Sequence, residues 1–415
     1  MYDTNSYQGR IRLMEETIAL KPYPRIPIAP GLGNVALHLS SNGATYRDVM
    51  YNPAKAADAA IEFYGWFRPD ATRSTGLQFY SGQANEIAGT NMFDWPGQPG
   101  KTVPDYTTYQ CHEIEYMHDD EYPELLQDLT GFLLRKVIPR SFDNLPGFAS
   151  LLINPGLHLG TSILAPLLAP PMLDVYDKLQ QMAAWEAAQN QEAARVEAYL
   201  REIGIPPLLT GMGIAPFDAI SDNLRGTTGA WMDLLERPAE VAAACDMIAD
   251  LTIAGWEYFK FAPLPVKRVF FPLHKGMDGL MSPEQFREIY WKPLMKLVHA
   301  LAEMGVVSMI FCEGRYNTRI NDMTDLPVGQ TVLRFEYADP QVCKKAFDGI
   351  ACLSGFVPIL NLDFGSKEQV IEDTKRVLDV VADGKGYIFD TTAGIEFAKR
   401  ENFEAMFDTV RNWGH

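Results

Sequence analysis

Short apolar runs alternate with amphipathic stretches along most of this chain. The runs are almost continuously apolar, which is typical of parallel strands buried on both faces. Eight of them are predicted as strands, over residues 25–30, 77–82, 207–212, 266–274, 306–312, 331–337, 350–356 and 386–392. Strand–helix alternation repeated over eight units predicts right-handed crossovers and a parallel sheet closed into a (β/α)₈ barrel.

Helix signals between the later strands support this order. Helices are predicted over 283–304, over 340–347 and from Ser366 to about 383, and each begins at a Ser or Asp of the kind favoured at N-caps. The first strand is followed by Gly31-Leu32-Gly33, which lacks the third glycine of a dinucleotide-binding turn. A barrel is therefore favoured over an open nucleotide-binding sheet.

Two long segments interrupt the alternation. Residues 84–120 are rich in Pro, Gly and Thr and are predicted to form a flap over the barrel mouth. Residues 169–205 are rich in Ala and Glu and are predicted to form one long helix. Because no Gly- or Ser-rich linker and no repeat occurs, residues 1–415 are predicted to form a single barrel domain with these two insertions.

Charge and composition exclude two classes of partner. The formal net charge of the 415 residues is −17, so a nucleic-acid partner is not expected, since that requires a basic surface. No run of eighteen apolar residues and no apolar signal segment occurs, so we expect no membrane partner and a cytoplasmic location. The sequence leaves a homodimer open.

The five cysteines are too few and too scattered for a disulfide framework. Cys245 and Cys343 lie on helical patterns and are interpreted as core residues, whereas Cys111 in the flap cannot be interpreted alone. Cys312 differs, because it closes an apolar strand and is followed directly by Glu313. We therefore interpret Cys312 as a functional thiol.

Polar residues gather where the predicted strands end, which is where barrel enzymes place their active sites. His38 and His274 could equally be structural histidines at strand ends. The residues at or near these ends are Asn34, His38, His274, Lys275, Asp278, Cys312, Glu313, Arg315, Glu336, Cys352, Asp390, Thr391 and Thr392.

Several segments are similar to the uroporphyrinogen decarboxylase superfamily, among them RIRLMEETIALKPYPRIPIAPG near the start, LTGMGIAPFDAISDNLRGTTGAWMDLLERPAEV over 209–241 and HKGMDGLMSPEQFREIYWKPLMKLV over 274–298. The resemblance implies a (β/α)₈ barrel. The decarboxylases themselves carry an arginine-rich segment after the first strand. Here that segment has no arginine before Arg47, which argues against decarboxylation of uroporphyrinogen.

The other branch of the superfamily contains zinc-dependent methyltransferases that work with corrinoid proteins. The His-x-Cys of its coenzyme M members is not matched, since Ile310 stands where the His would be. The chain resembles the O-demethylase members in the spacing of a carboxylate and two cysteines. Here 27 residues separate Glu284 from Cys312, and 39 separate Cys312 from Cys352. The resemblance implies that these three residues bind Zn²⁺, with Glu where the relatives carry Asp.

This resemblance implies demethylation of aryl methyl ethers such as vanillate, veratrol or guaiacol. Zinc would act as a Lewis acid on the ether oxygen, and the methyl group would pass to the Co(I) corrinoid of a separate corrinoid protein. We assign catalytic roles to His274, Asp278 and Arg315, and substrate contacts to the residues Lys275, Glu313, Asn34 and His38. Glu313 could also be a fourth zinc ligand.

Three alternatives stay open. The first is a corrinoid methyltransferase of the same fold with another methyl donor. The second is a metal-free decarboxylase of a small acid, with Asp278 or Asp390 and Arg315 handling charge. The third is a non-catalytic scaffold barrel. Zinc bound by the thiolates would separate the methyltransferases from the other two.

Overall fold

A computed structural model describes residues 3–73, 81–153 and 160–414. Its main feature is a parallel sheet of six strands in the order β3-β4-β5-β6-β7-β8. The strands are β3 (Gly211–Met212), β4 (Arg268–Leu273), β5 (Val307–Arg315), β6 (Thr331–Tyr337), β7 (Cys352–Gly355) and β8 (Tyr387–Ile388). Each strand pairs with the next in sequence, as right-handed crossovers require.

Two further extended segments close the sheet into a barrel. The segment around Ile28 forms a parallel bridge with Phe389 after β8, and the amide of Asp70 donates to the carbonyl of Ile28 at 2.7 Å. Thr72 then forms a parallel bridge with Pro207 just before β3. These pairings give eight strand positions in a closed ring, which confirms the predicted (β/α)₈ barrel.

The second strand was placed wrongly by the sequence pattern. Of the predicted strand 77–82, residues 77–80 lie outside the described residues, and Ser81 caps helix α5 (Gly82–Ala88) instead. Residues 70–72 occupy the second strand position. This segment contains only one apolar residue, Ala71, so no apolar run marks it.

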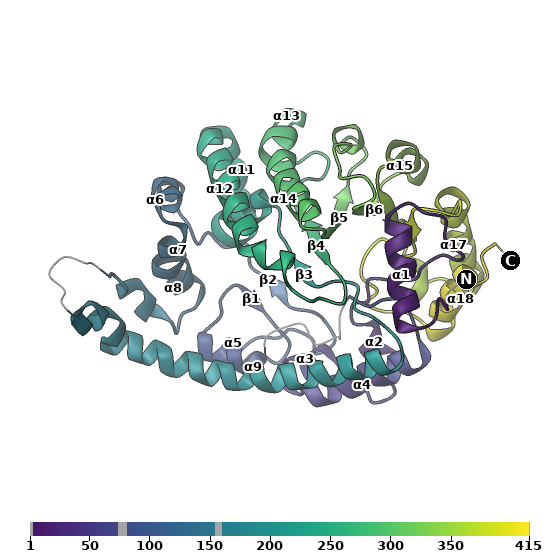
Figure 1. Cartoon of the computed structure of the whole chain (residues 1–415). Coiled ribbons are helices and arrows are strands. Elements are labelled where there is room, and N and C mark those ends of the chain that lie inside the picture. Colours follow the sequence, from purple (N-terminus) through teal and green to yellow (C-terminus); the bar gives the residue numbers. More distant parts are fainter. Residues whose placement is uncertain (1–2, 74–80, 154–159, 415) are drawn as a thin grey trace.

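Outer helices surround the sheet, and in Figure 1 they follow one another around it in sequence order. They are α4 (Pro53–Trp66), α9 (Pro170–Glu202), α12 (Pro238–Trp256), α14 (Lys292–Glu303), α15 (Pro340–Phe347), α17 (Lys367–Val381) and α18 (Arg400–Arg411). The helix predicted over 283–304 is continuous, through α13 (Pro283–Gln285), the π-helical η7 (Phe286–Trp291) and α14. The long helix predicted over 169–205 is α9.

Smaller elements complete the described chain. Near the start and in the first insertion these are α1 (Tyr7–Ile18), α2 (Val35–His38), α3 (Tyr46–Tyr51), β1 (Phe93–Asp94), β2 (Gln110–Cys111), η1 (Asp119–Glu121), α6 (Tyr122–Gln127), α7 (Leu129–Phe132), η2 (Leu133–Val137), α8 (Ile138–Ser141), η3 (Pro146–Ser150) and η4 (Gly160–Leu168). Around the barrel they are α10 (Pro216–Ile220), η5 (Ser221–Arg225), α11 (Gly226–Glu236), η6 (Glu257–Lys260), η8 (Ile320–Asp322) and α16 (Leu360–Asp363).

Side chains alternate between the inside and the outside of the barrel along each strand. One apolar cluster fills the lumen, with one or two residues from each strand position and with Met14 and Ile18 of α1. Its strand members are Ala29, Ala71, Leu208, Phe270, Met309, Phe311, Val332, Cys352 and Ile388. The intervening residues, such as Leu273 and Leu333, belong to the larger cluster shared with the outer helices. This alternation decides which polar side chains can face a substrate.

Candidate active site

Three of the polar residues predicted at strand ends face the barrel axis at its mouth. On β5, Phe311 points into the lumen, so Glu313 two positions later points the same way. By the same alternation, His274 lies four residues after lumen-facing Phe270 of β4, and Glu336 lies four residues after lumen-facing Val332 of β6. Both side chains therefore point toward the barrel axis. These carboxyl ends form one edge of the barrel, where parallel strands of this fold hold their active sites.

His274 is held by a carboxylate that the sequence analysis missed. Its Nδ1 lies 2.5 Å from Asp222 Oδ2, and its Nε2 lies 3.7 Å from Glu313 Oε2. The hydrogen bond with Asp222 raises the pKa of His274, with burial opposing it. Because the raised pKa favours the imidazolium near neutral pH, His274 is suited to act as a general acid.

Asp218 fixes the backbone beneath His274. It accepts hydrogen bonds from the backbone amides of His274 and Lys275, at 2.9 and 3.0 Å, and from the hydroxyl of Tyr290 at 2.8 Å. Burial raises the pKa of Asp218 to about 7, against the effect of the amide donors. Asp218 and Asp222 lie four residues apart in the helical stretch after β3, so one turn supplies both carboxylates.

Lys275 joins this group to the first insertion. Its Nζ lies 3.4 Å from Asp222 Oδ1 and 3.3 Å from Glu113 Oε1. Glu113 belongs to the segment predicted as a flap, just after β2. We call His274, Lys275, Glu313, Asp218 and Asp222 the rim cluster. Burial raises the pKa of Glu313, and the nearby positive charge of His274 lowers it.

An arginine layer lies one inward-facing position deeper in the lumen. Arg334 pairs with Phe311 in the sheet register, and its Nε lies 2.9 Å from Asp390 Oδ2. Arg73 reaches the same carboxylate oxygen at 3.4 Å. The backbone amide of Gly31 donates to Asp390 Oδ1 at 2.7 Å. We call Arg73, Arg334 and Asp390 the arginine layer.

The two guanidinium groups rest on aromatic rings of the lumen. Arg334 lies 4.2 Å above the ring centroid of Phe311, and Arg73 lies 4.3 Å above that of Phe270. Cation–π contacts of this kind hold the guanidinium groups in place within the apolar lumen. The carbonyl of Thr391 also accepts from Arg334, at 3.1 Å from Nε and 3.0 Å from Nη2.

The remaining predicted catalytic residues lie at the edge of this site. Asp278 accepts hydrogen bonds from Thr318, the shortest at 2.6 Å from its hydroxyl, and so serves as a loop contact. Arg315 ends β5 with an exposed side chain. Within the described ranges, neither residue makes a side-chain hydrogen bond to the rim cluster.

The two candidates after the first strand lie on the opposite side of the mouth, where the strand segment around Ile28 leads into α2. Asn34 is buried beside Glu396, whose Oε2 accepts from the Asn34 amide at 3.0 Å. His38 is exposed at the end of α2 and packs edge-on against Phe397, with ring centroids 5.2 Å apart. His38 therefore fits a structural surface residue rather than a substrate contact.

The structure does not bring the three predicted zinc ligands together. Cys312 belongs to the outer core between the sheet and the helices, whereas Cys352 belongs to the lumen cluster. In the sheet register Cys312 is level with Phe335 of β6, and Cys352 is level with Val332. The two thiols thus lie on opposite faces of the sheet, and their strand positions differ by about 10 Å in height.

Such positions cannot serve one ion, because two thiolates on one zinc each lie about 2.3 Å from it. Glu284 is exposed in the first turn of α13, outside the barrel mouth. Among the residues that the structure describes, no group of three or more His, Cys, Asp or Glu is placed to hold a metal ion. The ligand set implied by the sequence spacing therefore does not fit zinc.

Replacing either buried cysteine should leave the metal content of the protein unchanged. We expect Cys312→Ala and Cys352→Ala to retain whatever zinc the wild type carries, while each lowers the free energy of unfolding by about 1–2 kcal/mol through lost packing. Elemental analysis of purified protein and urea denaturation measure the two effects. Loss of about one zinc per chain in both variants would contradict this prediction and support zinc binding by the two thiolates.

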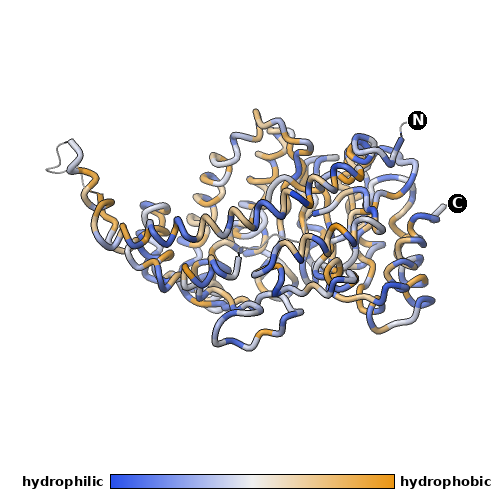
Figure 2. Tube along the Cα trace, turned by 90° about the horizontal axis from the view of Figure 1, so that it is seen from below, coloured by the Kyte–Doolittle hydropathy of each residue, from blue (hydrophilic) through white to orange (hydrophobic). Residues whose placement is uncertain are grey.

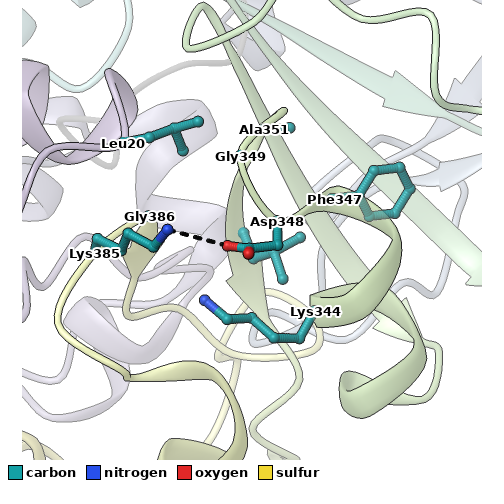
Figure 3. Close-up of a pocket in the computed structure, with 9 residues that line it drawn as sticks. Leu20, Lys344, Phe347, Asp348, Gly349, Ala351, Lys385 and Gly386 are labelled. Atoms are coloured by element: carbon teal, nitrogen blue, oxygen red, sulfur yellow. Dashed lines mark ion pairs between the residues drawn. The ribbon is translucent and has the colours of Figure 1, made fainter.

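Two hollows in the described structure lie at the opposite end of the barrel. Figure 3 shows one beside the amino ends of β7 and β8, where Lys385 pairs with Asp348 at 3.3 Å. Its volume of about 10 Å³ holds no more than one water. A hollow of about 390 Å³ lies near Glu15, Leu264 and Arg268, also at the amino-terminal end. Neither is placed for chemistry at the rim cluster.

None of the helices in the described ranges is long and apolar enough to cross a membrane. Among proteins of curated function, none matches this chain. A solved methyltransferase from Methanosarcina mazei is similar over 98% of each chain, with a TM-score of 0.59 and 14% identity.

Two other structures share less. A 3-keto-D-glucoside 4-epimerase from E. coli has a TM-score of 0.26 at 14% identity, over 52% of this chain and 81% of its own. A B12-independent methionine synthase from Shewanella sp. has a TM-score of 0.31 at 10% identity, over 93% of this chain and 97% of its own. The methyltransferase structure supports the barrel fold alone.

Residues 95–413 match the family described as Uroporphyrinogen decarboxylase (URO-D), and the chain belongs to this family.

Proposed function

We propose that this chain is a lyase that decarboxylates a small organic acid with acid–base groups of its own. The observation that carries the proposal is the stacking of two layers in one lumen, with the carboxylate-held His274 above the paired arginines. This reaction is one of the alternatives that the sequence leaves open. We favour decarboxylation over the aryl ether reaction because the zinc ligands implied for the latter lie apart.

The arginine layer supplies an anchor for a carboxylate. A guanidinium presents a planar fork of N–H donors that matches a carboxylate, and its charge persists when buried. Arg73 and Arg334 face the lumen from different strands, so the anchor is independent of the arginine-rich segment that the chain lacks. It would hold a carboxylate that stays on the substrate, since arginine stabilises the ionised group and would oppose loss of CO₂.

The separation of the layers limits the substrate. Arg334 and Glu336 are two residues apart on β6, which is a rise of about 6.6 Å along a parallel strand. A substrate anchored below and reacting above therefore needs its two functional groups about that far apart. A dicarboxylate on a short chain or a single ring meets this requirement, and a tetrapyrrole exceeds it.

The rim cluster supplies the proton. His274 would protonate the carbon framework from Nε2, and Asp222 would stabilise the imidazolium before transfer. The bond to the scissile carboxylate then breaks, its electron pair neutralises the protonated framework, and CO₂ leaves. Solvent returns a proton to His274. Asp218 acts as a positioning residue, because it contacts backbone amides of this loop.

The test is CO₂ release from a panel of short and monocyclic dicarboxylic acids, followed by headspace detection with carbon-labelled substrates. We expect release from an acid that has its carboxylates about 6–7 Å apart, and none from the matching monoester that masks the anchored group. Absence of release across the panel by folded protein, with or without added divalent metal, would contradict the proposal.

Methyl transfer is the second candidate, favoured by the methyltransferase from Methanosarcina mazei that is similar over the whole chain. His274 could protonate an aryl ether oxygen, which helps because phenoxide is a poor leaving group with a conjugate-acid pKa of about 10. A ring carboxylate would bind the arginine layer. The methyl acceptor would be the corrinoid of a separate protein, and no step is assigned to zinc. Phenol formation from a methoxybenzoate that requires a reduced corrinoid protein would favour this candidate.

A further inference from the structure

One segment of this acidic chain contains no charged residue at all. Between Asp143 and Asp174 the sequence has 30 residues, 144–173, without Asp, Glu, Lys or Arg. Because 21% of the whole chain is charged, a stretch of this length would carry about six such residues on average. Its aliphatic side chains are numerous.

The structure places the described parts of this segment, residues 144–153 and 160–173, at the end of an arm. The described parts form η3, η4 and the start of α9, which carries them sideways from the barrel in Figure 1. Apolar colour is concentrated at the outer end of the arm in Figure 2. No residue of η4 is buried. The exposed aliphatic side chains are Leu152, Ile153, Ile163, Leu164, Leu168 and Leu173, and we call them the arm tip.

The base of the arm is packed, so the arm tip has a fixed support. Leu145, Met172 and Val175 form a separate apolar core with Ala88 of α5. Gly147 lies so close to the backbone of Pro171 that a Cβ there would come within 2.2 Å of the Pro171 carbonyl oxygen. Beyond this core, Leu152 is 67% exposed and Leu168 is 61% exposed. Exposed apolar side chains gathered in this way are typical of an interaction site.

We propose that the arm tip is a homodimer interface that binds the arm tip of a second copy of this chain. The charge distribution of the chain favours a second copy as the binding partner. Two copies at −17 each repel one another, and that repulsion is weakest where a surface bears no charge. A two-fold contact brings a patch onto itself, so every charge in it would meet a like charge near the axis. A charge-free apolar patch meets both conditions.

Other occupants fit this surface less well. Binding to anionic membranes draws on Lys and Arg beside the apolar side chains, and residues 144–173 contain none. A partner protein recognised through complementary charge would find no charge of either sign in this segment. The arm projects away from the barrel strands in Figure 1.

The test is the mass of the full chain in solution, measured by light scattering and by sedimentation over a range of concentrations. We expect a dimer for the wild type and a monomer for Leu164→Asp and for Leu168→Asp. The control is Leu235→Asp, which changes a leucine that is 72% exposed on α11, and we expect it to remain a dimer. Unchanged circular dichroism and melting temperature would show that all variants fold.

Three results would overturn the proposal. The first is a wild type that is monomeric throughout the range. The second is a dimer that both arm-tip variants retain. The third is a monomer that cosediments with phosphatidylcholine vesicles through the arm tip, which would assign the surface to lipid. The mass measurement uses no substrate, so it is independent of the reaction proposed for the barrel.

Discussion

Replacing His274 with glutamine is expected to lower kcat by about 10²- to 10⁴-fold, with a much smaller change in KM. The reason is that His274 alone in the rim cluster combines a raised pKa with a nitrogen, Nε2, directed toward Glu313 and the lumen. Glutamine keeps a polar group of similar reach but cannot transfer a proton. The measurement is steady-state kinetics on the acid found in the CO₂ assay, with Lys292→Gln as the control on an exposed residue.

The variant Asp222→Asn tests whether Asp222 controls the protonation of His274. Asp222 raises the pKa of His274, so its removal should lower that pKa and move the alkaline limb of kcat/KM toward lower pH. Activity then falls at a pH where the wild type is still protonated. Nitrogen NMR of the His274 ring gives the same pKa without any substrate. An unchanged ring pKa in Asp222→Asn would contradict the assignment of Asp222, whatever the reaction proves to be.

The fold could be predicted where strands are long and fully buried. The strands from β4 to β6 are runs of buried residues, so their apolar patterns indicate them clearly. The second strand position could not be predicted in this way. It has only residues 70–72, and it is held by backbone pairing and by the Asp70–Arg25 ion pair at 2.6 Å. An apolar run cannot reveal a strand that tertiary contacts define.

The candidate site was predicted in part, and strand alternation explains the difference. His274, Lys275 and Glu313 were assigned functional roles and lie together. Cys312 was assigned one because it closes a strand, but its neighbour Phe311 faces the lumen, so Cys312 must face the helices. A shift of one residue changes the face of the sheet, and spacing between distant residues does not contain that information.

Two omissions had signals in the sequence. Arg334 interrupts the apolar run TVLRFEY, and a charge inside a doubly buried strand needs a buried partner. Asp218 and Asp222 stand four apart just after the third strand, at the same barrel edge as the residues that were chosen. The partner of Arg334 could not be named from sequence, because Asp390 follows the last strand and meets Arg334 only when the sheet curves into the barrel.

That buried pair gives the largest expected effect on stability. Arg334→Leu should lower the free energy of unfolding by about 3–5 kcal/mol, since it leaves the carboxylate of Asp390 buried with one of its two guanidinium partners removed. Both side chains of the pair are almost fully buried, at 5% and 2% exposure, so solvent cannot replace the lost contact. Urea denaturation followed by circular dichroism measures the change.

Two further variants test whether charge rather than volume is responsible. Arg376→Leu removes an exposed arginine that is paired with Asp373 at 2.5 Å, and a change of less than about 1 kcal/mol is expected there. Adding Asp390→Asn to Arg334→Leu should recover part of the lost stability, because the unpaired charge disappears while the amide of Gly31 keeps an acceptor. If the double variant is as unstable as the sum of the single variants, the arginine layer is held by packing alone and the case for its role as a carboxylate anchor weakens with it.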